Sequence, residues 1–335
     1  MSVTGSGLYA AICARGSIHG ADIAALRDLF YADDAIAVAD ADALFVINRT
    51  CCVQDASWQP FFVAAVADFI VGNAEPRGYI NTENADWLLE RISCEGRLET
   101  PTALEILIGA MAEARWSPES LVCHALNAVK DAILCGDGTL RYGKRFAPGV
   151  VTEGDVELLR RIILAYDGDG NSALSRAEAE ILVEINDATA DKTDNPAWTE
   201  LFVKALSGMA MASSGLQAPS RQEALQREQW QQTRGDFGPA DLVRQMFKIG
   251  LSGWFDHFVE QSPEQRELAR LDRERREIIV NEVVRDDEAA WLVGQINRVG
   301  ALTYNEQCLL ENLKGERSKL LPGFTEMIDR VAVSA

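Results

Sequence analysis

The stretch Asp167-Gly-Asp-Gly-Asn-Ser-Ala-Leu-Ser-Arg-Ala-Glu178 places oxygen-bearing side chains at alternate positions of a short polar turn. Asp167, Asp169 and Asn171 occupy positions one, three and five, and Ser175 occupies position nine. Calcium is a hard cation that takes about six to eight oxygen ligands, and a twelve-residue turn can wrap around it when oxygens fall at these positions. The spacing therefore predicts a calcium-binding loop.

The remaining positions of the turn agree with this prediction. Ala173 stands at position seven, where the backbone carbonyl is the ligand and a small side chain suffices. Glu178 stands at position twelve, where a longer carboxylate reaches back and binds through both oxygens. Leu174 supplies an apolar residue at position eight, and periodic apolar residues predict helices at roughly 155–166 and 175–187.

With flanking helices, this loop resembles the EF-hand family over about thirty residues. The resemblance implies a helix–loop–helix unit whose loop pairs with another loop through a short bridge at position eight, with Val151 and Leu302 as candidate partners for Leu174. The sequence departs from the family at position six, where Ser172 replaces glycine; a non-glycine residue in that conformation costs about 1–2 kcal/mol. The alternative is a polar turn between helices that binds nothing.

The chain repeats its own pattern of residues. The first copy contains, in order, Ile18, Asp22, Leu26, Arg27, Ile36, Asp40, Ile47, Asn48, Trp58, Phe62, Val63 and Ala65. The second contains Val151, Asp155, Leu159, Arg160, Leu174, Glu178, Ile185, Asn186, Trp198, Phe202, Val203 and Ala205. The offset grows from 133 to 138 between Arg27 and Ile36, so the second copy carries five extra residues inside the predicted loop.

A second repeat runs at a constant offset of 204. Its members are Ala85, Trp87, Leu88, Ile92, Gly96, Leu98 and Pro118, which match Ala289, Trp291, Leu292, Ile296, Gly300, Leu302 and Pro322. The chain is thus an A–B–A′–B′ series of units. Because helical spacing dominates and strand-like alternation is absent, we predict an all-α fold. The resemblance implies that it consists of duplicated EF-hand-like units with very short β-bridges between loops.

The pattern predicts four segments. Residues 1–136 form an N-terminal half with degenerate loops, 137–212 the unit with the intact loop, 213–280 a polar, partly helical linker insertion, and 281–335 a C-terminal unit. The recurring tryptophans of the repeat are expected to anchor the core rather than to form a ligand cage.

The other three loops are not expected to bind metal. The unit A loop is five residues shorter. The unit B loop, from Arg91 to Thr102, has a cation at position one and no carboxylate at position twelve. The unit B′ loop keeps Glu306 but has Gln295 at position one, and a single carboxylate is too little charge for calcium.

Composition narrows the possible partners. The formal charge of −19 disfavours binding to nucleic acid or to anionic lipid and favours cations and basic partners. Seven cysteines without CxxC spacing indicate buried thiols in a reducing compartment, and the N-terminus lacks the features of a signal peptide, so we expect a cytoplasmic protein.

No pattern for catalysis is present in the sequence. HExxH, GxSxG and phosphate-loop motifs are missing, and His124, in an apolar helix, is expected to be a core residue. The sequence therefore favours a non-enzymatic calcium-binding regulator or scaffold whose cofactor is Ca²⁺, with a protein as a further partner. The alternative is a metal-independent helical interaction scaffold in which the loop is a relic.

Overall fold

The computed structural model describes residues 3–31, 37–98, 100–136, 139–141, 144–166, 174–192, 195–213, 285–296, 298, 302–315, 320, 325 and 328–329. Helices dominate these residues, which confirms the predicted all-α class. The predicted linker insertion lies almost wholly outside them.

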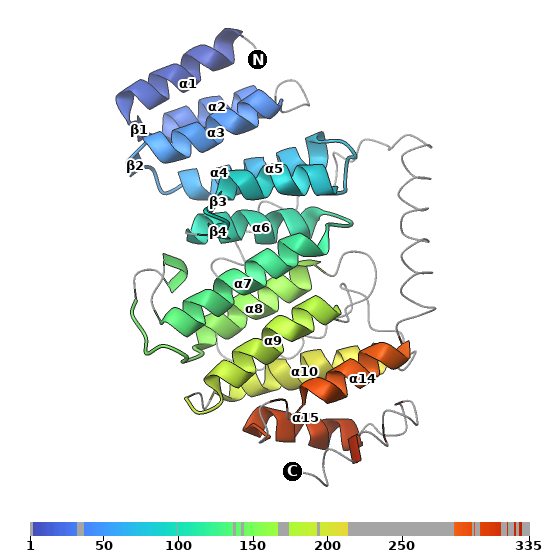
Figure 1. Cartoon of the computed structure of the whole chain (residues 1–335). Coiled ribbons are helices and arrows are strands. Elements are labelled where there is room, and N and C mark those ends of the chain that lie inside the picture. Colours follow the sequence, from blue (N-terminus) through green and yellow to red (C-terminus); the bar gives the residue numbers. More distant parts are fainter. Residues whose placement is uncertain are drawn as a thin grey trace, which may run out of the picture.

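The helices stack in chain order from one end of the molecule to the other, with the N- and C-termini at opposite ends (Figure 1). The first half contains α1 (Val3–Arg15), α2 (Gly20–Tyr31), α3 (Val38–Thr50), α4 (Trp58–Asp68), a π-helical turn (Phe69–Asn73), α5 (Thr82–Ile92), α6 (Pro101–Glu113) and α7 (Glu119–Cys135). The second contains a 3₁₀ turn (Thr139–Arg141), α8 (Glu153–Tyr166), α9 (Arg176–Thr189), α10 (Pro196–Ser213), α14 (Arg285–Gln295) and α15 (Tyr304–Gly315).

Local signals in the sequence fix where several helices begin and end. The Asn81 side chain accepts a hydrogen bond from the backbone N–H of Asn84 at the start of α5. Thr100 caps α6 in the same way, and Pro101 follows at a position where a missing N–H costs nothing. Gly136 ends α7 in the left-handed conformation, with φ of 67°.

Short strands join the ends of helix pairs. Strand β1 (Ser17–Ile18), before α2, pairs in parallel with β2 (Val53–Gln54), after α3. Tyr79, before α5, bridges in parallel to Trp116, after α6.

The third pairing has a different form, because β3 (Ser93–Cys94) and β4 (Arg97–Leu98) make an antiparallel hairpin within one loop. Short bridges are therefore present, but the described ones do not join two separate loops of the predicted kind. Two of them connect the residues before a pair of helices to the residues after that pair, and the third lies within one loop. Within the described part of the chain, Leu174 bridges to neither Val151 nor Leu302.

Large aromatic side chains anchor the core at repeated places. Trp58 stacks on Phe62 with ring centroids 5.5 Å apart, and Trp198 lies 5.7 Å from Phe202. All four side chains are almost fully buried. The tryptophan–phenylalanine pair is thus buried in both α4 and α10, with the rings stacked in α4 and tilted in α10.

Successive units join through helix packing. Helix α6 approaches α4 closely because Gly109 lies against Ala67 and Val63. Further along, α8 packs on α6 and α7, α9 packs on α7, and α14 and α15 pack on α10.

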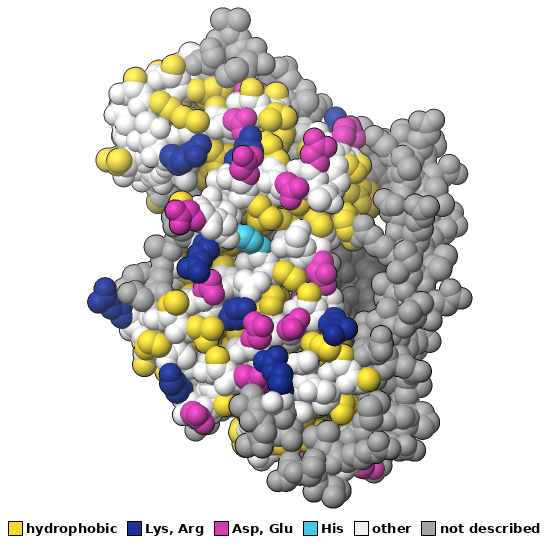
Figure 2. All heavy atoms as spheres, in the orientation of Figure 1, with side chains coloured by type: hydrophobic (Ala, Val, Ile, Leu, Met, Phe, Trp, Pro, Cys, Tyr) yellow, Lys and Arg dark blue, Asp and Glu magenta, His cyan; other side chains and the backbone are white. Residues whose placement is uncertain are grey.

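The surface is charged and mixed in sign. Figure 2 shows acidic and basic side chains interspersed on one face of the stack. No described helix has the length and apolar character needed to cross a bilayer.

The prediction that the cysteines are buried was wrong for most of them. All seven are free thiols, but of these only Cys51 is buried, whereas Cys52, Cys94 and Cys135 are exposed. Cys135 is the last residue of α7, whereas Cys52 lies in the turn after α3 and Cys94 in β3, where apolar helical spacing does not apply.

Candidate metal site

The predicted loop lies between two helices, as expected. Helix α8 ends at Tyr166 and α9 begins at Arg176, close to the limits read from apolar spacing. Both helices pack against α7. Leu174, at the end of the loop, is buried with 6% of its surface exposed, which matches the apolar role expected at position eight.

The structure describes two of the six predicted ligands. Ser175 and Glu178 are described, whereas Asp167, Asp169, Asn171 and Ala173 lie outside the described residues. These two residues form the C-terminal end of the candidate site.

Ser175 and Glu178 form a reciprocal cap at the start of α9. The backbone N–H of Glu178 donates to Ser175 Oγ at 3.2 Å, and the backbone N–H of Ser175 donates to Glu178 Oε2 at 2.9 Å. A serine followed three residues later by glutamate satisfies two backbone donors that a helix start leaves free. The cap turns the Glu178 carboxylate back toward the loop.

Burial makes Glu178 chemically unusual. Only 2% of its surface is exposed, and this burial raises the pKa of the carboxyl to about 7, with a smaller contribution from the negative charge of Glu119; the bonds from Ser175 act in the opposite direction. Among the residues that the structure describes, no lysine, arginine or histidine forms an ion pair with it. A buried carboxylate without a cationic partner fits a site in which a metal ion supplies the positive charge.

The equivalent cap in unit B′ offers a comparison. The backbone N–H of Thr303 donates to Glu306 Oε2 at 2.7 Å, and the backbone N–H of Glu306 donates to Thr303 Oγ1 at 3.2 Å. Glu306 is also buried, with 3% exposed. The cap is thus shared by units A′ and B′, and in B′ it stands in a loop that lacks the carboxylates at positions one and three.

Units A and B lack this cap. In unit A the residue before α3 is Ala37, which makes no side-chain cap, and Asp40 accepts a hydrogen bond from the Tyr9 hydroxyl at 3.1 Å. In unit B, Thr100 is the capping residue, so the third helical position falls on Ala103 rather than on the predicted Thr102. No carboxylate stands at that position in unit B.

Within the described ranges, no group of three or more histidine, cysteine, aspartate or glutamate side chains is placed so that it could hold a metal ion. Those ranges exclude residues 167–173, which hold both of the predicted aspartate ligands.

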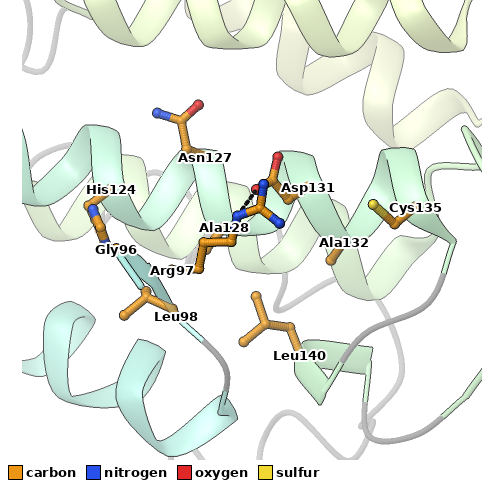
Figure 3. Close-up of a pocket in the computed structure, with 10 residues that line it drawn as sticks. All are labelled: Gly96, Arg97, Leu98, His124, Asn127, Ala128, Asp131, Ala132, Cys135 and Leu140. Carbon is orange, nitrogen blue, oxygen red and sulfur yellow. Dashed lines mark ion pairs between the residues drawn. The ribbon is translucent and has the colours of Figure 1, made fainter. Parts of the chain in front are cut away.

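Sequence reasoning missed a shallow pocket of about 190 Å³ between the β3–β4 hairpin and α7 (Figure 3). His124, predicted to be a core residue, is only half buried there; its Nε2 lies 3.1 Å from Ser93 Oγ, and burial lowers its pKa. Arg97 and Asp131 face each other across the pocket at 3.9 Å.

The signal for this pocket was present in the sequence. Positions 124, 128, 131 and 135 form one stripe along α7 at helical spacing. The polar groups lie around an open depression and do not converge on one point, so the arrangement favours no particular chemistry.

Comparison with known proteins adds no relative: no protein-family model, curated protein or solved structure matches the chain.

Proposed function

We propose that the protein binds one calcium ion through the loop from Asp167 to Glu178 and acts as an EF-hand-like regulator or scaffold. The observation that carries the proposal is the buried Glu178 carboxylate, which ends a loop rich in oxygen ligands and has no described cationic partner. The free thiols of the seven cysteines fit the reducing cytoplasm expected from the sequence.

Each residue would act in a way that its chemistry dictates. Asp167, Asp169 and Asn171 would supply side-chain oxygens, Ala173 its carbonyl, Ser175 a contact through water, and Glu178 both carboxylate oxygens. The bound ion would supply the positive charge that the buried Glu178 lacks. Binding would require Glu178 to lose its proton and to loosen its bond from the Ser175 backbone N–H.

A second function is favoured by a specific observation. Because Thr303 and Glu306 make the same cap in a loop poor in ligands, capping alone accounts for the position of Glu178. The protein would then be a metal-independent interaction scaffold of stacked helices, and the loop a relic.

Calorimetry with calcium at millimolar magnesium separates the two functions. The proposal predicts one site in the wild type and loss of the heat signal in Asp167→Ala and Glu178→Gln. Glu306→Gln is the matched control, since it changes the equivalent buried capping glutamate outside the loop and should keep the site. A silent wild-type titration would contradict the calcium site and favour the scaffold. A Glu306→Gln variant that loses binding would contradict the assignment of the loop.

A further inference from the structure

In unit A, an asparagine and a tryptophan of the repeat are bonded to each other. The Trp58 indole Nε1–H donates to Asn48 Oδ1 at 3.0 Å. Trp58 has 1% of its surface exposed, so this bond satisfies a donor that water does not reach. Asn48 Oδ1 also accepts a hydrogen bond from Gln54 Nε2 at 3.4 Å, so both of its donors belong to unit A.

The equivalent pair in unit A′ is not bonded. Asn186 and Trp198 occupy the same two places in the repeat and are both fully buried. Trp198 Nε1–H has no hydrogen-bond partner among the residues that the structure describes. The Asn186 amide is instead turned to the C-terminal unit: its Oδ1 accepts from Asn305 Nδ2 at 2.8 Å, and its Nδ2 donates to Thr303 Oγ1 at 3.0 Å.

Docking of α15 explains the difference. Thr303 and Asn305 stand at the start of α15, and the Thr199 hydroxyl of α10 donates to Asn305 Oδ1 at 2.6 Å. Among the described residues, the Asn186 amide oxygen accepts from Asn305, and the Trp198 indole N–H does not reach it. The docked arrangement therefore gains two bonds for Asn186 and leaves one buried indole N–H unsatisfied, which is an unfavourable state for a polar group without water.

We propose that Asn186 is a two-position switch that reports whether the C-terminal unit is docked. With α14 and α15 in place, it bonds Thr303 and Asn305. With them displaced, its side chain turns to Trp198 and forms the bond that Asn48 and Trp58 make in unit A. This second bond stabilises the undocked state and so reduces the free-energy difference between the docked and undocked states. The C-terminal unit can therefore dock reversibly. The inference does not depend on calcium.

Nuclear magnetic resonance of the indole N–H groups in the full chain tests the switch. The signals of Trp58 and Trp198 are assigned from Trp58→Phe and Trp198→Phe. In Asn305→Ala, which removes the partner of Asn186 Oδ1, the Trp198 indole proton should move downfield toward the position of Trp58. Amide exchange in α15 should accelerate roughly tenfold, because the bonds from Asn305 to Asn186 and Thr199 are lost.

Two further variants keep the result interpretable. Asn312→Ala removes the bond from the Ser207 hydroxyl in the same interface at 3.0 Å without touching Asn186, and should shift Trp198 less than Asn305→Ala does. Asn186→Ala/Asn305→Ala should abolish the downfield shift, because residue 186 then has no amide oxygen to accept a hydrogen bond from the Trp198 indole N–H. An unmoved Trp58 signal shows that the fold is intact. A Trp198 signal that stays in place in Asn305→Ala, or one that still moves in the double variant, would overturn the switch.

Discussion

Burial and the proposed metal binding make opposite demands on the charge of Glu178. Burial favours the neutral carboxyl, metal binding needs a carboxylate, and the capping bonds from Ser175 also favour the carboxylate. Burial raises the pKa of this group from the ordinary 4.5 to about 7. In the metal-free protein, the folded state therefore holds the proton more tightly than the unfolded chain does, and stability contributed by this group falls as pH rises from about 4.5 to 7.

The raised pKa of Glu178 predicts how the stability of Glu178→Gln differs from that of the wild type in the absence of calcium. Glutamine is neutral at every pH and can still make the cap. The two proteins should have similar free energies of unfolding at pH 4, and the variant should be more stable by up to about 3 kcal/mol at pH 8. Urea unfolding in the presence of a chelator measures this difference. A wild type that gains stability over the variant as pH rises would contradict it.

The two repeated tryptophans give a matched pair of substitutions. Trp58→Phe removes a satisfied indole N–H and leaves Asn48 Oδ1 without that donor, whereas Trp198→Phe removes a donor that has no partner. Both lose similar packing, because both side chains are buried to the same degree. We expect Trp58→Phe to cost about 1–3 kcal/mol more in unfolding free energy than Trp198→Phe. Equal costs in urea unfolding would mean that the unpaired indole carries no penalty.

At the scale of the element, two glycines have the same left-handed backbone conformation but different surroundings. Substituting each by alanine distinguishes the cost of backbone strain from the cost of steric contact with neighbouring atoms. Gly136, which ends α7, and Gly16, after α1, have φ of 67° and 68°. A Cβ on Gly136 would lie 2.4 Å from the carbonyl oxygen of Phe146, whereas a Cβ on Gly16 meets nothing within 4 Å. Gly16→Ala should cost about 1–2 kcal/mol from the left-handed conformation alone.

Gly136→Ala should cost clearly more than Gly16→Ala, because the backbone around Phe146 must also shift. Thermal unfolding of both variants measures the difference. Equal losses would show that residues 144–150 move aside without penalty.

The elements were largely predictable, because each is encoded locally. Apolar spacing gave the helices on either side of the loop, and the recurrence of Trp58 and Trp198 gave two core anchors. The Ser175–Glu178 cap is also encoded locally, as a serine followed three residues later by glutamate.

Contacts between distant segments were not predictable in the same way. The buried Arg141–Asp155 pair, at 2.6 Å, joins a 3₁₀ turn to the start of α8, and no periodic pattern marks it. The partners of Asn186 lie 117 and 119 residues further along the chain. A sequence pattern fixes which face a residue occupies, but not which unit covers that face.

At the scale of the whole molecule, α9 connects the candidate site to the C-terminal unit at both of its ends. Near the loop, the Arg176 guanidinium lies 5.1 Å from the centre of the Trp291 ring in α14. Further along, Asn186 contacts the start of α15, and Asp187 pairs with Arg298 at 2.7 Å. Whatever fixes residues 175–178 therefore also fixes surfaces on which α14 and α15 rest.

If the loop binds calcium, this geometry predicts that calcium and docking favour each other. Ordering of the loop would hold Arg176 against Trp291, so calcium should slow amide exchange in α15. Thermodynamic reciprocity then requires that weaker docking lowers calcium affinity by the same factor, typically at least about fivefold. Calorimetry on Asn305→Ala should show this loss, with Asn312→Ala as the milder control at the same interface. Equal calcium affinities in wild type and Asn305→Ala, alongside faster exchange in α15, would show that α9 carries no coupling although both the site and the docking exist.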